Sequence, residues 1–184
     1  MTQIKQICAN YKTMKHKQLT YEEHSYSGKK HPLAFMLDGI TSPYNIGSAF
    51  RLADALGVEK IYLVGNTLCP PKKRITKTAR SKEKEIPWEY YKTVEDALQK
   101  VKNDGYSIIS AEITDNSKDL SQCVFDTSKK ICIVAGSERQ GVSQEILDNS
   151  QEVVHIPMVG KGSSMNVIMA LAIVTYEVVN QWGK

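Results

Sequence analysis

The first clear pattern of apolar and polar positions predicts a strand, a helix and a second strand. Residues 33–37 form a continuous apolar run, which is typical of a strand buried on both faces. After a break at residues 38–44, apolar side chains recur at helical spacing, at Ile46, Ala49, Phe50, Ala53 and Leu56. Gly57 ends this predicted helix, and residues 61–64 form a second buried strand. The segment therefore predicts a β-α-β unit.

The same alternation continues along the rest of the chain. Residues 94–101 have a helical pattern, residues 106–111 and 131–135 read as strands, and a helix is expected after Gly141. Alternating strands and helices are typical of a mostly parallel sheet that is covered by helices on both faces. We therefore expect an α/β fold.

The last predicted helix, residues 164–181, is apolar on nearly every side. Its apolar positions include Val167, Ile168, Leu171, Val174, Val178 and Val179. Such a helix must be buried on more than one side. A second copy of the chain would supply the extra surface, although the sheet and a neighbouring helix would also do so within one chain. Of the two, we expect a homodimer.

Length and composition are those of a single globular domain. The chain has 184 residues, 41% of them hydrophobic and 24% charged, and no apolar run approaches the roughly 18 residues that a membrane span requires. Residues 1–6 lack the apolar core of a secretory signal. We expect a cytoplasmic protein with no membrane partner.

The cysteines and histidines do not suggest a metal site. The four cysteines include no C-x-x-C pair, and the four histidines have no zinc-ligand spacing with them. We expect reduced thiols and no bound metal.

Positive charge is concentrated in one segment. The whole chain has a net charge of +4, yet residues 72–84 alone hold seven cations and one acid, so the remainder is net negative. A solvated charge run is the simplest explanation. Arginines and lysines grouped in this way also suit a phosphate backbone, and we predict nucleic-acid contacts at Lys72, Lys73, Arg74, Lys77 and Arg80. Residues 1–32 form a second basic segment, which we expect to be an N-terminal appendage to a domain at residues 33–184.

Three polar segments are predicted to follow strands. They contain Asn45 and Arg51, the run Gly136 to Gly141, and Ser164 with Asn166 after a glycine-rich loop. Because parallel sheets bind ligands at the carboxyl ends of their strands, the three segments are expected to converge on one site. Residues 136–141 have the glycine spacing of a phosphate-binding P-loop, but Val142-Ser143 follows where Lys and Ser or Thr are required. No dinucleotide fingerprint follows the first strand either, so a nucleotide-like cofactor without a polyphosphate fits better.

Each of these residues also has an ordinary structural explanation. Arg51 could be a surface arginine, and Glu138 could stabilise the start of the following helix. Ser164 and Asn166 could simply cap the last helix. Only their joint occurrence favours a site.

Together the three segments resemble the SpoU/TrmH family of RNA ribose 2′-O-methyltransferases, in the SPOUT superfamily. The resemblance lies in residues 37–58, which include Asn45 and Arg51, in residues 134–142, and in residues 155–158 with 164–177. It covers the chain from about residue 33 to its C-terminus.

The resemblance implies an α/β fold with a C-terminal trefoil knot, a homodimer with composite active sites, and S-adenosylmethionine as cofactor. The implied cofactor-binding residues are Ala135, Gly136, Ser137, Glu138, Ile156, Met158, Gly160, Ser164, Met165 and Asn166. It also implies that Arg51 is the catalytic arginine and that Asn45, Glu138, Ser164 and Asn166 shape the site around it. A guanidinium stays protonated, so we expect Arg51 to orient the acceptor hydroxyl and to stabilise developing negative charge.

The implied substrate is RNA, and tRNA is favoured over rRNA. Family members that modify rRNA often carry a separate N-terminal RNA-binding domain, for which residues 1–32 are too short. Two other functions stay open: a non-catalytic RNA-binding protein on the same scaffold, and an unrelated nucleotide-binding α/β domain.

Overall fold

The computed structural model describes residues 17–20, 22–25, 27–160 and 164–182. Residues 1–16 of the predicted appendage and residues 161–163 of the glycine-rich loop lie outside the described residues. The first strand begins at His31, two residues before the predicted start of the apolar run.

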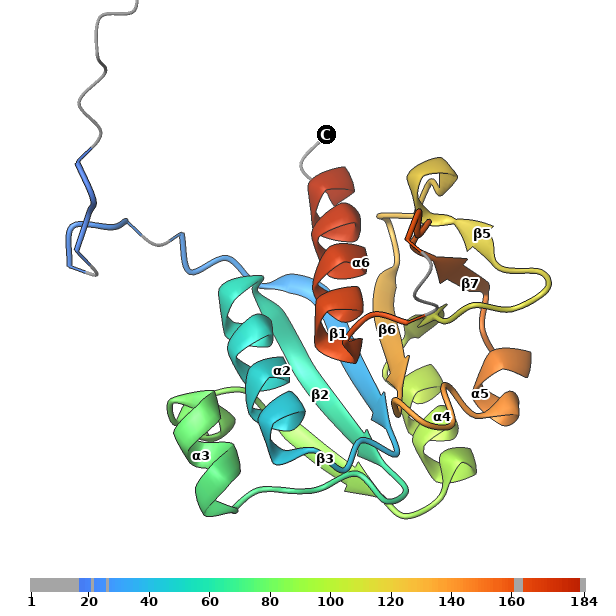
Figure 1. The fold of residues 1–184 in the computed structure, drawn as a ribbon, viewed down its shortest axis with the longest axis horizontal. Helices are drawn as coiled ribbons and strands as arrows, with labels where there is room; N and C mark the ends of the chain where they lie inside the picture. The colour runs from blue at the N-terminus through green and yellow to red at the C-terminus, as the bar shows by residue number, and fades with distance from the viewer. Residues whose placement is uncertain (1–16, 21, 26, 161–163, 183–184) are drawn as a thin grey trace, which may run out of the picture.

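The described chain folds around one sheet of seven strands, and all of the paired strands run parallel (Figure 1). Their order across the sheet is β3-β2-β1-β6-β4-β7-β5. The strands are β1 (His31–Asp38), β2 (Val58–Val64), β3 (Trp88–Tyr91), β4 (Tyr106–Ala111), β5 (Lys118–Asp119), β6 (Lys130–Gly136) and β7 (Glu152–His155). The predicted parallel sheet is confirmed. The apolar pattern did not indicate β3, β5 and β7, which have only four, two and four residues.

Helices cover both faces of this sheet, as predicted. They are α2 (Pro43–Ala55), α3 (Lys73–Ala79), α4 (Val94–Asn103), α5 (Gln144–Asp148) and α6 (Val167–Trp182), with short 3-10 turns η1 (Lys82–Lys84) and η2 (Leu120–Gln122). In Figure 1, α2, α3 and α6 lie on one side of the sheet and α4 and α5 on the other. The alternation of side chains along β1 explains this arrangement. Leu33 and Phe35 belong to the core under α2, α3 and α6, whereas Ala34 and Met36 belong to the core under α4 and α5.

Polar side chains fix where α2 and α6 begin. Ser42 Oγ accepts the backbone N–H of Asn45 at 3.4 Å, and Pro43 occupies the first turn, where its missing N–H costs nothing. Helix α6 begins at Val167, three residues later than the predicted start at Ser164. The reason is that Asn166 Oδ1 accepts the N–H groups of Ile168 and Met169, at 3.0 and 3.4 Å, and so caps the helix.

The basic segment contains a helix, α3, that the apolar pattern did not predict. Only Ile75 and Ala79 of its seven residues are buried, which leaves little periodic signal in the sequence. The two side chains pack under α2, and α3 approaches α2 closely at Gly47. A Cβ atom on Gly47 would lie 2.6 Å from Thr78 Cβ and 2.9 Å from the Ile75 carbonyl oxygen. The absence of a side chain at Gly47 therefore allows the basic helix to dock.

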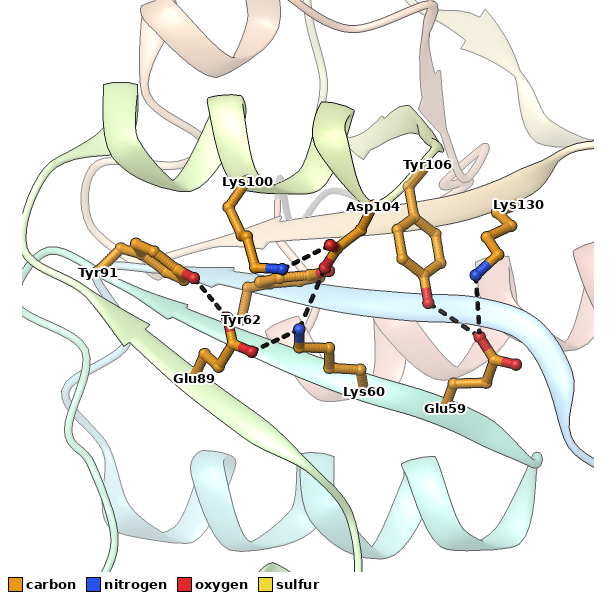
Figure 2. A network of polar contacts seen from close by, with 9 residues as sticks. All are labelled: Glu59, Lys60, Tyr62, Glu89, Tyr91, Lys100, Asp104, Tyr106 and Lys130. Atoms are coloured by element: carbon orange, nitrogen blue, oxygen red, sulfur yellow. Dashed lines mark hydrogen bonds and ion pairs between the residues drawn. The ribbon is translucent and has the colours of Figure 1, made fainter.

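A network of charged and tyrosine side chains joins β2, β3 and β4 to the end of α4 (Figure 2). Its centre is the Asp104 carboxylate, which accepts from Lys100 Nζ and Tyr62 Oη, each at 2.5 Å, and from Lys60 Nζ at 3.1 Å. Partial burial opposes ionisation of Asp104, but the three hydrogen bonds outweigh it and hold the pKa of this carboxyl well below its usual range. Burial, together with the hydrogen bond to Asp104, raises the pKa of Tyr62.

We predict that Asp104→Asn lowers the free energy of unfolding by about 2 kcal/mol at neutral pH, because Lys60, Lys100 and Tyr62 lose a charged acceptor in a partly buried place. A carboxyl whose pKa is lowered by folding stabilises the native state above its unfolded pKa and loses that contribution as the pH falls. The difference between variant and wild type should therefore narrow from about pH 5 to about pH 2 in denaturant titrations. The control is Glu85→Gln, which removes one member of an exposed pair with Lys82. It should lower the free energy of unfolding by less than about 0.5 kcal/mol. A deficit that does not depend on pH would contradict this account.

Candidate active site at the carboxyl edge of the sheet

Three loops that are distant in sequence meet where β1, β6 and β7 end. The Asn45 side-chain amide donates through Nδ2 to a carboxylate oxygen of Glu138, and its Oδ1 accepts from Asn166 Nδ2 at 3.3 Å. The predicted convergence is thus confirmed for these three side chains. Asn166 caps α6 through its oxygen, as considered from sequence, and its nitrogen donates to Asn45.

The turn that carries Glu138 is held at both ends. Gly141 N–H donates to the Ser137 carbonyl at 2.9 Å, which closes the turn after β6. Beyond it, the backbone N–H of Val142 donates to Glu112 Oε2 at 2.9 Å, and that of Ser143 donates to Asp38 Oδ2 at 2.8 Å. Two carboxylates therefore fix the chain that leaves this turn, one at the end of β1 and one directly after β4, the two strands that flank β6.

Two glycines allow the turn to fold so tightly. A Cβ atom on Gly136 would lie 2.1 Å from the carbonyl carbon of Gly141, which is a backbone atom that cannot rotate away. Gly141 has φ +67°, a conformation that strains any residue with a side chain, and a Cβ there would lie 2.5 Å from Glu112 Oε2. Close backbone packing at Gly136 and Gly141 therefore shapes the tight turn of residues 136–141, which we call the cradle.

A cavity of about 410 Å³ opens between this turn, the loop after β7 and the start of α6. Eight of the predicted cofactor-binding residues line it: Gly136, Ser137, Glu138, Ile156, Met158, Ser164, Met165 and Asn166. Ala135 and Gly160 do not line it. Ala135 is buried within β6, where it pairs with Leu37 and Ala111, so its side chain belongs to the core.

Sequence reasoning missed several lining residues. They are Ala111, Glu112, Ile113, Gly141, Val154, His155, Val167, Ala170 and Val174. Glu112 and Ile113 directly follow β4, so the rule that ligands bind beyond the carboxyl ends of parallel strands was the signal that could have identified them.

The charges around the cavity suit a cationic ligand. Glu112 and Glu138 both line it, and its described lining includes no lysine or arginine. A polyphosphate would require cations or a free helix N-terminus, whereas a sulfonium or an ammonium group is attracted by carboxylates. The volume also lies within the roughly 300–1000 Å³ of small-ligand pockets. The residues present therefore fit S-adenosylmethionine.

Among the described residues, no cluster of three or more His, Cys, Asp and Glu side chains is arranged to hold a metal.

The structure does not bring Arg51 to this cavity. Its side chain is exposed on α2, lines no part of the 410 Å³ space and makes no hydrogen bond or ion pair within the described chain. The neighbouring residues Leu52 and Leu56 border a second, apolar hollow of about 590 Å³ between α2, α6 and the loop after β7. Ile156 lines both hollows, so the two spaces adjoin.

Part of α6 presents apolar side chains to solvent beside this second hollow. Met169 is 63% exposed, Ile173 41% and Tyr176 65%. The opposite side of the helix packs on the sheet through Leu171, Val174 and Val178. Packing within one chain therefore does not cover every apolar side of α6.

No helix among the described residues is long and apolar enough to cross a membrane.

All five cations of the predicted RNA-binding set are exposed. Lys73, Arg74 and Lys77 lie on α3, Lys72 precedes it and Arg80 follows it. Within the described part of the chain, none of these five side chains forms an ion pair, whereas Lys82 pairs with Asp54 and Glu85. The group is therefore free to neutralise an external anion.

Comparisons with known proteins agree with this geometry. A model described as the SpoU rRNA Methylase family matches residues 32–176. The tRNA (guanosine(18)-2'-O)-methyltransferase of Escherichia coli strain K12 is 29% identical over 152 residues, which cover 81% of this chain and 63% of that protein. The 23S rRNA (guanosine-2'-O-)-methyltransferase RlmB of Blochmanniella floridana is 30% identical, and the match covers 82% of this chain and 58% of that protein. The chain thus spans about three fifths of the length of these relatives.

The crystal structure of an AdoMet-bound rRNA methyltransferase from Sinorhizobium meliloti superposes with a TM-score of 0.76 and 26% identity. The superposition covers 86% of this chain and 62% of that one. The family model matches well over half of the chain, and the fold agrees with that of a solved rRNA methyltransferase. The chain belongs to the SpoU rRNA methylase family.

Proposed function

We propose that this protein is an S-adenosylmethionine-dependent RNA methyltransferase that methylates a ribose 2′-hydroxyl. The observation that carries the proposal is the meeting of Asn45, Glu138 and Asn166 beside a cavity with two carboxylates and no described lysine or arginine. When bound, S-adenosylmethionine supplies an electrophilic methyl group on a positively charged sulfur. Gly136, Ser137, Met158 and Met165 would form the walls that hold it.

In this proposal the residues of the chain act mainly by positioning. Methyl transfer requires the acceptor oxygen to approach in line with the bond that breaks, so holding both reactants supplies much of the acceleration. The Asn45–Glu138–Asn166 group fixes three loops relative to one another, and Ser164 lies at the same cavity. Arg51 would orient the 2′-hydroxyl and stabilise the oxyanion that develops as its proton leaves.

We also propose a homodimer in which Arg51 serves the cavity of the partner. Arg51 does not line the cavity of its own chain, and it lies next to an apolar hollow that adjoins that cavity. Packing of the exposed apolar side of α6 from a second copy against this hollow would bury Tyr176 and Ile173. The C-terminal trefoil knot that the family resemblance implies is part of the same proposal.

We favour tRNA as substrate, because the Escherichia coli relative is named a tRNA methyltransferase, and keep rRNA as the alternative, because the Blochmanniella floridana relative is named for 23S rRNA. We also propose that the protein acts on such a substrate in the cytoplasm. The proposed organisation keeps residues 1–32 as a basic appendage to a methyltransferase domain at residues 33–184. The last two residues of that segment, His31 and Pro32, already belong to β1, and the His31 ring stacks on Trp182 with 5.6 Å between ring centroids.

The basic helix supplies the first test of RNA binding. We predict that the triple variant Lys72→Ala, Lys73→Ala and Arg74→Ala weakens RNA binding and lowers the slope of log affinity against log salt by about 2 units, because fewer counterions are released. Filter binding over a salt series measures both quantities. The control is Lys92→Ala, Lys102→Ala and Lys129→Ala, which removes the same charge from exposed positions outside α3. Equal slopes for the two triple variants would mean that the α3 cations form an ordinary solvated surface and do not bind RNA.

A further inference from the structure

The carboxylate of Glu112 contributes to the negative charge of the cavity, but neither the sequence pattern nor the proposed mechanism assigns it a specific contact. Glu112 is the first residue after β4, and its own backbone N–H donates to the Val154 carbonyl of β7 at 3.0 Å. This bond extends the sheet by one residue and fixes where the side chain starts. Glu112 is partly buried and lines the cavity beside Gly136 and Gly141.

Two backbone amides fix the orientation of this carboxylate. Oε2 accepts the N–H of Val142 at 2.9 Å, and Oε1 accepts the N–H of Ile113 at 2.8 Å. An ionised carboxylate has about four acceptor sites, so two are used and the others remain available. No lysine or arginine among the described residues forms an ion pair with Glu112. The carboxylate is therefore held in a fixed orientation at the wall of the cavity, and no lysine or arginine of the described chain is paired with it.

Asp38 shows that holding the turn does not require a carboxylate in the cavity. Asp38 performs the same structural task one residue later, since its Oδ2 accepts the Ser143 N–H at 2.8 Å. Asp38 is only 8% exposed, and it is not part of the cavity lining. The two acids thus share the anchoring of the turn, but only Glu112 faces the ligand space.

We propose that Glu112 is a cofactor-recognition residue whose carboxylate accepts hydrogen bonds from S-adenosylmethionine, either from its ribose diol or from its α-ammonium group. This inference rests on the proposed function. Both groups are donors that a fixed carboxylate recognises, and an ionised acceptor gives the stronger, charge-assisted bonds. The position also explains why Gly141 has no side chain, because a Cβ there would displace the Glu112 oxygen that faces the turn.

The experiment is isothermal calorimetry with the full chain, comparing the wild type with Glu112→Gln and with the control Asp38→Asn. The probes are S-adenosylmethionine and 5′-methylthioadenosine, which keeps the adenosine but lacks the amino-acid part. We expect Glu112→Gln to weaken S-adenosylmethionine binding at least about tenfold, in keeping with the loss of a charged hydrogen bond. Asp38→Asn should leave binding within about twofold, since it removes a charge that does not line the cavity.

The second probe identifies the group that Glu112 contacts. A similar loss for 5′-methylthioadenosine assigns the carboxylate to the ribose diol. A loss confined to S-adenosylmethionine assigns it to the cationic amino-acid end, because 5′-methylthioadenosine lacks both the ammonium group and the sulfonium charge. Equal affinities for Glu112→Gln and wild type would overturn the inference. So would equal losses for Glu112→Gln and Asp38→Asn that follow their melting temperatures, because both acids would then act only by anchoring the turn. Failure of the wild type to bind either probe would instead overturn the cofactor assignment of the proposed function, and this inference with it.

Discussion

Replacing Arg51 with alanine is expected to lower methyl transfer roughly 100- to 1000-fold, which is typical when a group that stabilises transition-state charge is removed. The affinity for S-adenosylmethionine should change by less than about twofold, because the proposed role of Arg51 is to contact the acceptor hydroxyl and not the cofactor. Single-turnover methylation with saturating RNA, alongside calorimetry with the cofactor, separates the two quantities. Arg51→Lys keeps the charge without the planar fork, and we expect it to recover only part of the rate.

Turnover by Arg51→Ala at the wild-type rate would remove its assigned role and favour a surface arginine. If the variant instead lost cofactor affinity together with rate, Arg51 would be supporting the fold of the cavity. The separation of rate from affinity is therefore the informative result.

Replacing Gly136 with alanine should have an equally large effect by a different route. The added Cβ would lie 2.1 Å from backbone atoms of Gly141, so the turn that carries Glu138 must move. We expect weaker cofactor binding and a loss of methyl transfer of about 100-fold, because a displacement near 1 Å is enough to misplace a reacting group. The free energy of unfolding should fall by about 1–3 kcal/mol, as is usual for overpacking.

Gly105→Ala is the matched control for this variant. Gly105 has φ +83°, so alanine there is also strained, but no atom lies within 4 Å of the added Cβ. Both variants should lose stability, and only Gly136→Ala should lose cofactor affinity. Normal binding by Gly136→Ala would contradict the role of the glycine pair as a cradle.

Co-expression of the two variants tests the proposed composite site. In a mixed dimer, the Gly136→Ala subunit keeps Arg51 and the Arg51→Ala subunit keeps an intact cavity. If Arg51 serves the partner, mixed dimers regain methyl transfer that neither parent shows. No recovery in demonstrated mixed dimers would assign Arg51 to the cavity of its own chain.

Sequence predicted best those parts of the fold where apolar periodicity is strong. Strands β1, β4 and β6 are nearly continuous apolar runs, and both cores follow from their alternation. Strand β7 and helix α3 were not predicted, because they are short and use few apolar side chains. Their stability comes from pairing with β4 and from docking on α2 at Gly47, and both are tertiary effects.

The candidate site divides along a similar line. Glycine and asparagine in recognisable motifs located Gly136, Asn45 and Asn166, and the structure joins their loops at one cavity. Glu112 belongs to no such motif, and its importance appears only when β4 and the turn after β6 are seen side by side. Ala135 was included because it lies inside a motif, although its side chain belongs to the core. Motifs identify segments of chain, whereas the direction of each side chain depends on the fold.

The most direct test of the central claim is transfer of labelled methyl groups from S-adenosylmethionine to tRNA and, separately, to rRNA, followed by nucleoside analysis of the product. We predict a 2′-O-methylated nucleoside, with the label in tRNA. The same product in rRNA alone would keep the reaction and correct the substrate. Label on a base, or no transfer to either RNA by protein that binds the cofactor, would contradict the assignment as a ribose methyltransferase.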